Sequence, residues 1–345
     1  MIQEDDYPRQ KKLYKLSMKV VLIMRPGGGG YSLELVYQKI YAELGKLNIE
    51  IVMYQMQSNT LVPIDDIKKL RNLNADVYHI CGDVSYLAIY LLGRNVILTI
   101  HDIGHYFSLK GLKKFAYKIL WINLPAYFSR MIFASSEKTQ QRLSSVISFS
   151  KEKIRHVPLC TGLDISPLAS KKPSDIFTIL HIGTAAHKNL SNVILAIEHL
   201  KCRLVIVGKI NSEDLLLLSK LDIKFTSLVD ITNEELVAHY QNADLVTFPS
   251  FHEGFGLPII EAQSAGVPML TSAIEPMTEI AGSGAHFVNP HSVSEITKGI
   301  DKIINNQEYQ QHLVTQGLRN AEKYSAKLIT MTHLNLYKEL FGASK

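Results

Sequence analysis

Cysteine is scarce in this chain of 345 residues, and the three cysteines, Cys81, Cys160 and Cys202, are far apart. Their odd number and the lack of a Cys-x-x-Cys pair argue against a disulfide framework and against a zinc site. A reducing cytoplasm is therefore the expected location.

Long hydrophobic runs are also lacking. The longest, "YLAIYLLGRNVILTI" (86–100), is interrupted by Gly-Arg-Asn and is shorter than the ~20 residues that a membrane-spanning helix needs. The run "VVLIM" (20–24) is too short for a signal peptide, so we expect none. Any contact with a membrane is therefore expected to be peripheral, at the inner face of the cytoplasmic membrane.

Charge of one sign is not in large excess. The chain has 37 Lys and Arg against 32 Asp and Glu, a formal net charge of +5. Without a concentrated basic patch this balance does not indicate nucleic acid as a partner.

What the sequence does contain is a regular alternation of short β-rich runs with amphipathic helical segments, which is typical of parallel α/β domains. The apolar character of the runs suits strands covered on both faces. A stretch rich in Pro, Ser and Lys at 166–174 looks like a linker between two series. The predicted strands are 19–24, 49–54, 76–80, 96–101, 131–136 and 154–159, then 177–183, 203–208, 223–227, 245–250, 267–272 and 285–289.

The sequence therefore predicts two doubly wound, Rossmann-like α/β domains that face each other across a cleft. The predicted boundaries are 1–165 for an acceptor domain, 166–320 for a donor domain and 321–345 for a closing helix. In such sheets ligands bind at the carboxyl ends of the strands, so motifs at those ends are the first candidates for a site.

The strongest candidate is "FHEGFGLPIIEAQSAG" (251–266), which follows a predicted strand. Pro258 suits the first turn of a helix, and the glycines at 254 and 256 allow the amides of 255–257 to approach a ligand. A helix N-terminus favours a phosphate. Glu261 is placed to bind ribose hydroxyls and Glu253 those of a second sugar. The alternative is a glycine turn with two solvated glutamates.

The longer string "NEELVAHYQNADLVTFPSFHEGFGLPIIEAQSAGVPMLTSAIEPMTEIAG" (233–282) resembles the C-terminal domain of family 4 glycosyltransferases. These are retaining enzymes of the GT-B fold, marked by two glutamates separated by seven residues. The similarity is strong over about 177–295 and looser in the first half. It implies that Glu253 contacts the donor sugar, that Glu261 binds the ribose and that the amides of 255–257 hold the diphosphate.

The stretch "HIGTAAHKNL" (181–190) is similar to the phosphate loop of that family. Lys188 is implied to neutralise the diphosphate as it leaves. Many relatives have an arginine after Gly183, where this chain has Thr184. The alternative for Lys188 is an exposed lysine at a helix start.

In the first domain, "VILTIHDIGHY" (96–106) resembles the family's histidine–aspartate motif, which implies that His101 lines the cleft opposite the donor. A satisfied structural histidine is the alternative, and a role for His105 is less firmly implied. "RPGGGGYS" (25–32) does not match G-x-G-x-x-G, so a dinucleotide site is not expected. By resemblance Gly28 and Gly29 lie near the donor phosphates, with a flexible turn as the alternative.

The resemblance thus implies a catalytic set of His101, Glu253 and Lys188. The implied donor-binding set is Gly28, Gly29, Gly183, Thr184, Lys188, Val229, Glu253, Gly254, Phe255, Gly256, Leu257 and Glu261. No Asp-x-Asp pair stands at a strand end, so we expect neither a metal nor another cofactor.

Two further segments carry expectations. At 109–121, Leu109, Leu112, Phe115, Ala116, Ile119 and Leu120 form one face of a predicted helix, and Lys110, Lys113, Lys114 and Lys118 form the other. Such a helix can lie on an anionic membrane, or it can be an ordinary domain helix with its apolar face in the core. The segment 306–341 is predicted to be helical throughout and to cross back to the first domain, although Ala326 replaces the family's usual tryptophan.

The expected function is a retaining hexosyltransferase that moves a sugar from a nucleotide-diphosphate donor to a hydroxyl of a glycan or lipid-linked acceptor, in bacterial surface polysaccharide or lipid-linked glycan synthesis. A nucleotide-sugar epimerase or a phosphorylase on the same fold is one alternative. A non-catalytic nucleotide-sugar binding protein is the other.

Overall fold

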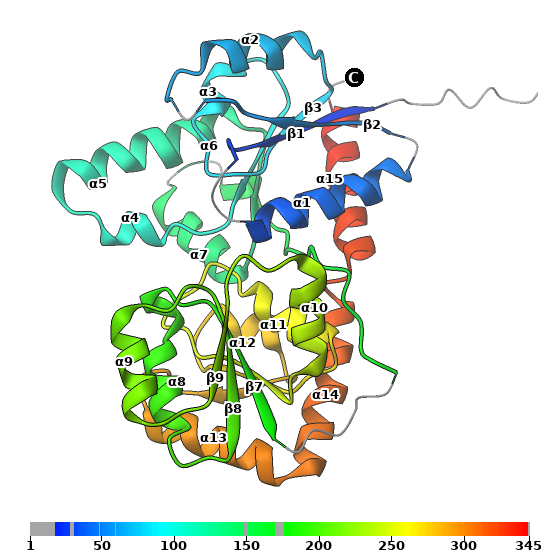
Figure 1. Ribbon diagram of the computed structural model, residues 1–345. Helices are drawn as coiled ribbons and strands as arrows, with labels where there is room; N and C mark the ends of the chain where they lie inside the picture. The colour runs from blue at the N-terminus through cyan, green and yellow to red at the C-terminus, as the bar shows by residue number, and fades with distance from the viewer. Residues whose placement is uncertain are drawn as a thin grey trace, which may run out of the picture.

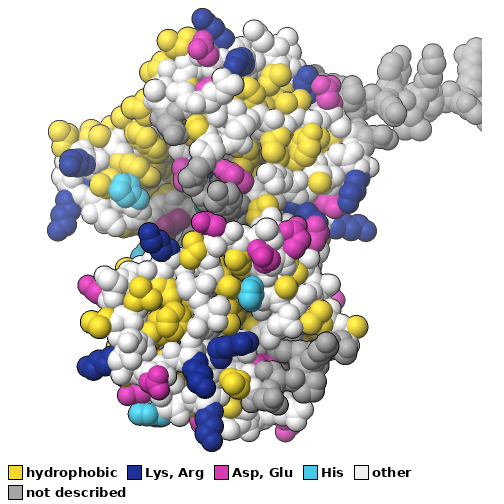
Figure 2. Space-filling model, in the orientation of Figure 1, with side chains coloured by type: hydrophobic (Ala, Val, Ile, Leu, Met, Phe, Trp, Pro, Cys, Tyr) yellow, Lys and Arg dark blue, Asp and Glu magenta, His cyan; other side chains and the backbone are white. Residues whose placement is uncertain are grey.

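The computed structural model describes residues 18–27, 31–47, 49–58, 60–147, 149, 151–169 and 176–343. Within these residues, two parallel sheets of six strands form the centres of two domains, one above the other (Figure 1). Helices pack around each sheet, and the surface narrows between the domains (Figure 2). The predicted architecture of two doubly wound α/β domains is confirmed.

The first sheet has the strand order β2-β1-β3-β4-β5-β6. Its strands are β1 (Lys19–Met24), β2 (Glu50–Gln55), β3 (Val77–Ile80), β4 (Val96–Ile100), β5 (Met131–Ala134) and β6 (Ile154–His156). The helices of this domain are α1 (Tyr31–Gly45), α2 (Ile64–Asn72), α3 (Leu87–Tyr90), α4 (Gly104–Ser108), α5 (Gly111–Tyr117), the π-helical turn η1 (Lys118–Asn123), α6 (Leu124–Phe128), α7 (Glu137–Val146) and the 3-10 turn η2 (Lys151–Lys153).

The second sheet has the order β12-β11-β10-β7-β8-β9. Its strands are β7 (Phe177–Ile182), β8 (Cys202–Val207), β9 (Phe225–Leu228), β10 (Leu245–Phe248), β11 (Met269–Ser272) and β12 (His286–Val288). The other elements are the 3-10 turn η3 (Ala186–Lys188) and the helices α8 (Leu190–Ala196), α9 (Ser212–Lys220), α10 (Asn233–Asn242), α11 (Leu257–Ser264), α12 (Met277–Ala281), α13 (Val293–Asn305), α14 (Gln307–Glu322) and α15 (Ala326–Ala343).

Each of the twelve predicted strands is present, although several end earlier than predicted. β3, β5, β10 and β11 are buried along their whole length, as strands covered on both faces should be. β5 ends at Ala134, where its partner strand β6 also ends, at His156. The side chain of the next residue, Ser135, donates to the carbonyl of His101 at 2.9 Å.

The C-terminal segment is not helical throughout, which corrects the prediction for 306–341. α14 ends at Glu322 and α15 begins at Ala326, and the break lets α15 leave the second domain and lie beside α1 and β3 of the first (Figure 1). Tyr337 of α15 is fully buried, and its hydroxyl lies 2.7 Å from Nδ1 of His79 in β3. The chain therefore crosses back without the family's tryptophan.

The segment 109–121 also differs from its prediction. A helix begins at Gly111 rather than at 109, and its last turns before α6 are π-helical. Leu112, Phe115 and Leu120 of the apolar face are 82%, 61% and 42% exposed, whereas Leu109, Ala116 and Ile119 are half-buried. Only part of the predicted apolar face is therefore covered by the domain. No helix in the described part of the chain is long and apolar enough to cross a membrane.

We predict that replacing Tyr337 with alanine destabilises the protein by roughly 3–5 kcal/mol, because the change empties a buried ring site. Tyr337→Phe is expected to cost about 1–3 kcal/mol, since Nδ1 of His79 loses its partner in the interior. Urea denaturation measures both changes. Lys327→Ala, on the exposed face of the same helix, is the control. Equal stability of Tyr337→Ala and the control would show that α15 is not anchored here.

Candidate active site

Lys188 and Glu253 meet at the point where the strand order of the second sheet reverses. β7 and β10 are neighbours in the sheet although β8 and β9 lie between them in sequence, so the connections after β7 and β10 run to opposite sides. Lys188 follows β7 and Glu253 follows β10, and Nζ lies 2.8 Å from Oε1. The carboxyl edge at such a reversal is where open α/β sheets bind ligands.

Both side chains of this ion pair are largely shielded, with 20% of Lys188 and 12% of Glu253 exposed. Nζ of Lys188 also lies 4.6 Å from the ring centroid of Phe248. These positions argue against the two alternatives of an exposed lysine and a solvated glutamate. The attraction between the ammonium of Lys188 and the carboxylate of Glu253 is stronger than it would be in water, because charges are screened less away from solvent.

Two residues position Lys188. Gly183 has φ +93°, and a Cβ there would lie 2.9 Å from Cγ of Lys188, so only glycine leaves room for the lysine stem. Asn189 has a left-handed backbone and is buried. Its side-chain amide donates to the carbonyls of Pro249 at 2.9 Å and Pro290 at 2.7 Å, which ties the Lys188 turn to the end of β10.

The turn between Glu253 and α11 has the predicted form of an anion site. Gly256 is the N-cap of α11 with φ +112°, and Pro258 lies in the first turn. Phe255 and Leu257 are buried, and the Phe255 ring packs edge-on against Tyr324, with centroids 5.9 Å apart. The side chains of Phe255 and Leu257 thus point into the protein. The first backbone N–H groups of a helix have no partner within the helix and are therefore able to bind phosphate.

Glu261 is in the interior, with 7% of the residue exposed. Its Oε2 accepts a hydrogen bond of 2.6 Å from the hydroxyl of Tyr240. Burial raises the pKa of this carboxyl to about 7, and the Tyr240 hydrogen bond and the charge of Lys188 oppose the rise. The position excludes the alternative of a solvated glutamate, and the contact with ribose stays a prediction.

Thr184 follows β7 and Val229 follows β9, so they lie on either side of β8 at the same sheet edge. Oγ1 of Thr184 donates to the carbonyl of Lys209 at 2.7 Å, and Val229 follows β9 and is 48% exposed. Lys209 follows β8 and is exposed. This second lysine at the same sheet edge was not predicted, although its place directly after a predicted strand end was a usable signal.

His101 follows β4 in the first domain. Its Nε2 lies 3.0 Å from the carbonyl of Cys81, so Nε2 carries the hydrogen. Nδ1 is buried without a hydrogen-bond partner. Burial lowers the pKa of His101, which keeps the ring neutral and leaves a lone pair on Nδ1. His101 is therefore not a satisfied structural histidine, because one nitrogen lacks its acceptor interaction.

The two domains touch at this point. A Cβ on Gly254 would lie 2.9 Å from the carbonyl oxygen of His101 and 3.0 Å from Cβ of Asp102. Oγ of Ser136, the N-cap of α7, donates to the carbonyl of Gly254 at 3.2 Å. Ser136 was not predicted, because its partner Gly254 lies 118 residues away in the sequence. Gly28 and Gly29 lie outside the described residues.

One group in the described part of the chain has the donor types for a metal. Ligand atoms of Glu137, His156 and Glu279 lie within 4.8 Å of one another at the domain junction. The Glu279 carboxylate already accepts the N–H of Glu137 at 2.8 and 3.0 Å, so it serves as a cap on α7. This group lies apart from the Lys188–Glu253 pair and carries no part of the site.

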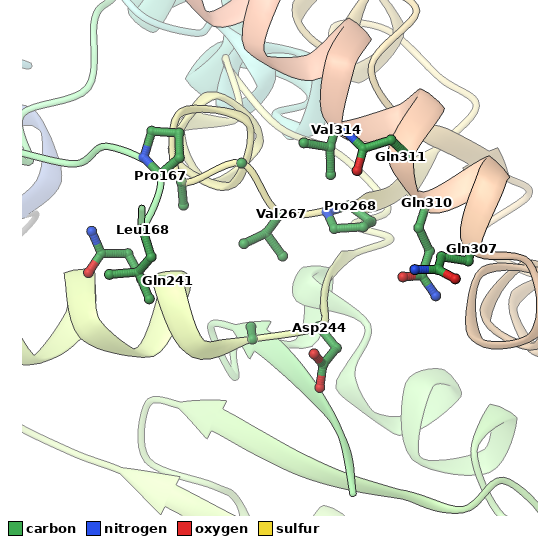
Figure 3. A pocket seen from close by; sticks show the side chains of 13 residues that line it. Pro167, Leu168, Gln241, Asp244, Val267, Pro268, Gln307, Gln310, Gln311 and Val314 are labelled. Atoms are coloured by element: carbon green, nitrogen blue, oxygen red, sulfur yellow. The ribbon is translucent and has the colours of Figure 1, made fainter. Parts of the chain in front are cut away.

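A cavity of about 240 Å³ lies at the opposite edge of the second sheet (Figure 3). Asp244 precedes β10 and Pro268 precedes β11, so both mark the amino ends of strands. Pro167 of the linker and Gln311 of α14 line the other side. Its place away from the carboxyl edge separates it from the candidate site.

Solved structures with the same fold are glycosyltransferases. Sucrose-phosphate synthase from Thermosynechococcus elongatus superposes with a TM-score of 0.78 at 16% identity, covering 94% of this chain and 100% of that chain. HepE from Anabaena, solved with UDP and glucose, gives a TM-score of 0.75 at 15% identity over 93% of this chain and 100% of that chain. The fold is therefore GT-B.

Proteins of similar sequence are named as glycosyltransferases too. O-antigen chain mannosyltransferase B from Escherichia coli is 24% identical over 79% of this chain and 76% of its own length. Serotype-specific mannosyltransferase WbdA from Escherichia coli is 27% identical over 66% of this chain, which spans only 31% of that protein. Residues 166–319 match the family model of glycosyl transferases group 1. The second domain thus matches this family, and the chain is a glycosyltransferase of the hexosyltransferase type.

The burial of Glu261 generates a prediction on stability. Its folded pKa of about 7 lies above the ordinary value of 4.5. Between these values the folded protein holds a proton that the unfolded chain has released, so stability falls as pH rises through this window. We expect the wild type to lose up to about 3 kcal/mol relative to Glu261→Gln between pH 5 and 7.5.

Urea denaturation of both proteins at each pH measures this difference. Glu339→Gln removes an exposed carboxyl from α15 and serves as the control. Parallel stability profiles of wild type and Glu261→Gln would contradict the raised pKa.

Proposed function

We propose that the protein transfers a hexose, with retention, from a nucleotide-diphosphate sugar to a hydroxyl of a growing surface polysaccharide or lipid-linked glycan. Mannose is the proposed sugar, because the named relatives are O-antigen and serotype-specific mannosyltransferases. The proposal rests on the ion pair between Lys188 and Glu253, whose Nζ and Oε1 atoms lie 2.8 Å apart. The pair lies where the strand order of the second sheet reverses.

In this proposal the amides before α11 bind the diphosphate and Lys188 stabilises its charge as the bond to the sugar breaks. Glu253 accepts hydroxyls of the donor sugar, and Glu261 those of the ribose. Across the junction, Nδ1 of His101 accepts a hydroxyl near the reacting carbon, since it has no other hydrogen-bond partner. Catalysis then rests on the positioning of the substrates and on the stabilisation of charge, both of which act without a covalent intermediate.

We further propose that no metal is needed. A helix start and a lysine supply the positive field that a divalent cation supplies in other transferases. The proposed donor-binding residues Gly183, Thr184 and Val229 line the same sheet edge.

Replacing Lys188 with alanine is expected to lower kcat/KM by about 10²–10³, because one group that stabilises charge in the transition state is lost. Glu253→Gln keeps the shape of the site but removes the anion, and a comparable loss is expected. Lys201→Ala, an exposed lysine before β8, is the matched control. Thermal shifts with UDP, GDP, ADP and dTDP select the donor before the assay.

The products of this assay separate the alternatives. An epimerised free nucleotide sugar would indicate an epimerase, and turnover that depends on phosphate would indicate a phosphorylase. Nucleotide-sugar binding without turnover would indicate a binding protein. Full activity of Lys188→Ala would contradict the proposed role of the pair.

We also propose that the arm formed by α4, α5 and η1 rests on an anionic membrane surface. The arm projects from the first domain and carries clustered hydrophobic side chains (Figure 2). Phe107, Leu112 and Phe115 are 47%, 82% and 61% exposed. Exposed apolar residues beside lysines are typical of helices that lie in a membrane interface.

Changing Lys110, Lys113, Lys114 and Lys118 together to glutamate is expected to abolish sedimentation with vesicles that contain anionic lipid, because attraction becomes repulsion. Wild-type binding should weaken as salt is raised. Four changes at Lys201, Lys220, Lys224 and Lys298, in the donor domain, provide a charge-matched control. Unchanged vesicle binding of the arm variant would remove the membrane proposal.

A further inference from the structure

Three side chains with metal-binding atoms meet where the two domains touch. Glu137 is the first residue of α7 and His156 is the last residue of β6, both in the first domain, whereas Glu279 lies in α12 of the second. One ligand atom of each residue lies within 4.8 Å of the other two. An imidazole with two carboxylates is a donor set that suits a transition metal. The cluster is separate from the Lys188–Glu253 pair, where no metal is proposed.

His156 directs toward this cluster a nitrogen that has no hydrogen-bond partner. Its Nε2 is buried and makes no hydrogen bond, although it lies 3.4 Å from Oε1 of Glu279. Burial lowers the pKa of His156, while the charge of Glu137 and the backbone of Ser135 oppose the change. A neutral ring whose lone pair faces a carboxylate oxygen is unfavourable, and a cation between the two atoms would turn the contact into an attraction.

The distance between these two atoms fits a zinc ion. Zinc binds histidine nitrogen at about 2.0–2.1 Å and carboxylate oxygen at about 2.0–2.2 Å, so at the tetrahedral angle two such ligands lie about 3.3–3.5 Å apart. Nε2 of His156 and Oε1 of Glu279 are 3.4 Å apart. Glu137 is exposed, so its carboxylate can rotate toward the ion as the third ligand. Water would take the fourth position.

Glu279 is already oriented for this task. Its two oxygens accept the backbone N–H of Glu137 at 2.8 and 3.0 Å. Each carboxylate oxygen has a second lone pair, and hydrogen bonds of this kind orient metal ligands. Among the residues that the structure describes, no lysine or arginine forms an ion pair with Glu137 or Glu279. A divalent cation would therefore compensate two neighbouring negative charges.

We infer that Glu137, His156 and Glu279 form a zinc site that joins the two domains. Two ligands come from the first domain and one comes from the second, so the bound ion adds a link to the hydrogen bonds at the junction. The link lies one residue from Ser136, whose Oγ donates to the carbonyl of Gly254 in the donor loop. Zinc thus fixes the donor loop against the first domain. The inference goes beyond the proposed transferase function and does not depend on it.

Zinc chloride, added to the untagged, metal-free full chain, is the probe. We expect calorimetric titration to show one Zn²⁺ per chain. Roughly a hundredfold excess of zinc over its Kd should raise Tm by about 3 °C or more, because the ion binds the folded state. Mg²⁺ prefers six oxygen ligands and should leave Tm unchanged at the same concentration. A Tm that zinc does not change, or an equal effect of Mg²⁺, would overturn the inference.

Two variants test whether the ligands come from both domains. His156→Asn in the first domain and Glu279→Gln in the second are each expected to weaken zinc binding about tenfold or more and to remove the rise in Tm. Glutamine at 279 can still accept the N–H of Glu137, so the fold should tolerate it. His199→Asn is the matched control, since Nε2 of His199 also lies near a carboxylate, 3.7 Å from Oε2 of Glu198, but outside the cluster.

The pattern of losses decides the inference. Loss of the zinc response in only one of His156→Asn and Glu279→Gln would place the ion in a single domain and overturn the link. Loss in His199→Asn would indicate adventitious binding at a surface histidine and would overturn it too. Should either cluster variant fold poorly, as circular dichroism would show, Glu137→Gln at its exposed position decides, and wild-type affinity in that variant contradicts the site. None of these measurements needs a donor or an acceptor, so their outcome is separate from that of the transferase assay.

Discussion

The ion pair between Lys188 and Glu253 is the contact on which the arrangement of the donor domain depends. It joins the connection after β7 to the connection after β10, which leave the sheet in opposite directions. Breaking a shielded pair leaves one charge without compensation, which costs more than the pair itself contributes. The pair therefore keeps the two charges balanced at this sheet edge. In the proposed function, a diphosphate shares the lysine with Glu253.

A second constraint is the close approach of Gly254 to His101 across the domain junction. Because a side chain at 254 has no room, the donor loop and the histidine motif can be neighbours only with glycine there. Oγ of Ser136, which belongs to the first domain, donates a hydrogen bond to the carbonyl of Gly254. The same residues thus make the contact between the domains and bring the donor loop beside His101.

Strand and motif patterns were sufficient to predict both sheets and the strand-end place of Lys188, Glu253 and His101. The pairing of Lys188 with Glu253 was not predictable in the same way, since 65 residues separate them and the strand order is a property of the whole sheet. The break before α15 and the π-helical turn also escaped prediction, because tertiary packing overrides the 3.6-residue period there. Glu261 was predicted to lie on α11, but its burial against Tyr240 depends on how α10 packs.

The exposed arm and a cavity beside His101, which Trp121 lines, belong to one stretch of chain. Phe115 on the outside of α5 and Trp121 in η1 are six residues apart, so the exposed apolar side chains of the arm lie close to the cavity beside His101. An acceptor whose lipid remains in a membrane must present its sugar near the headgroups. An enzyme that rests on this arm would receive such a sugar without extracting the lipid.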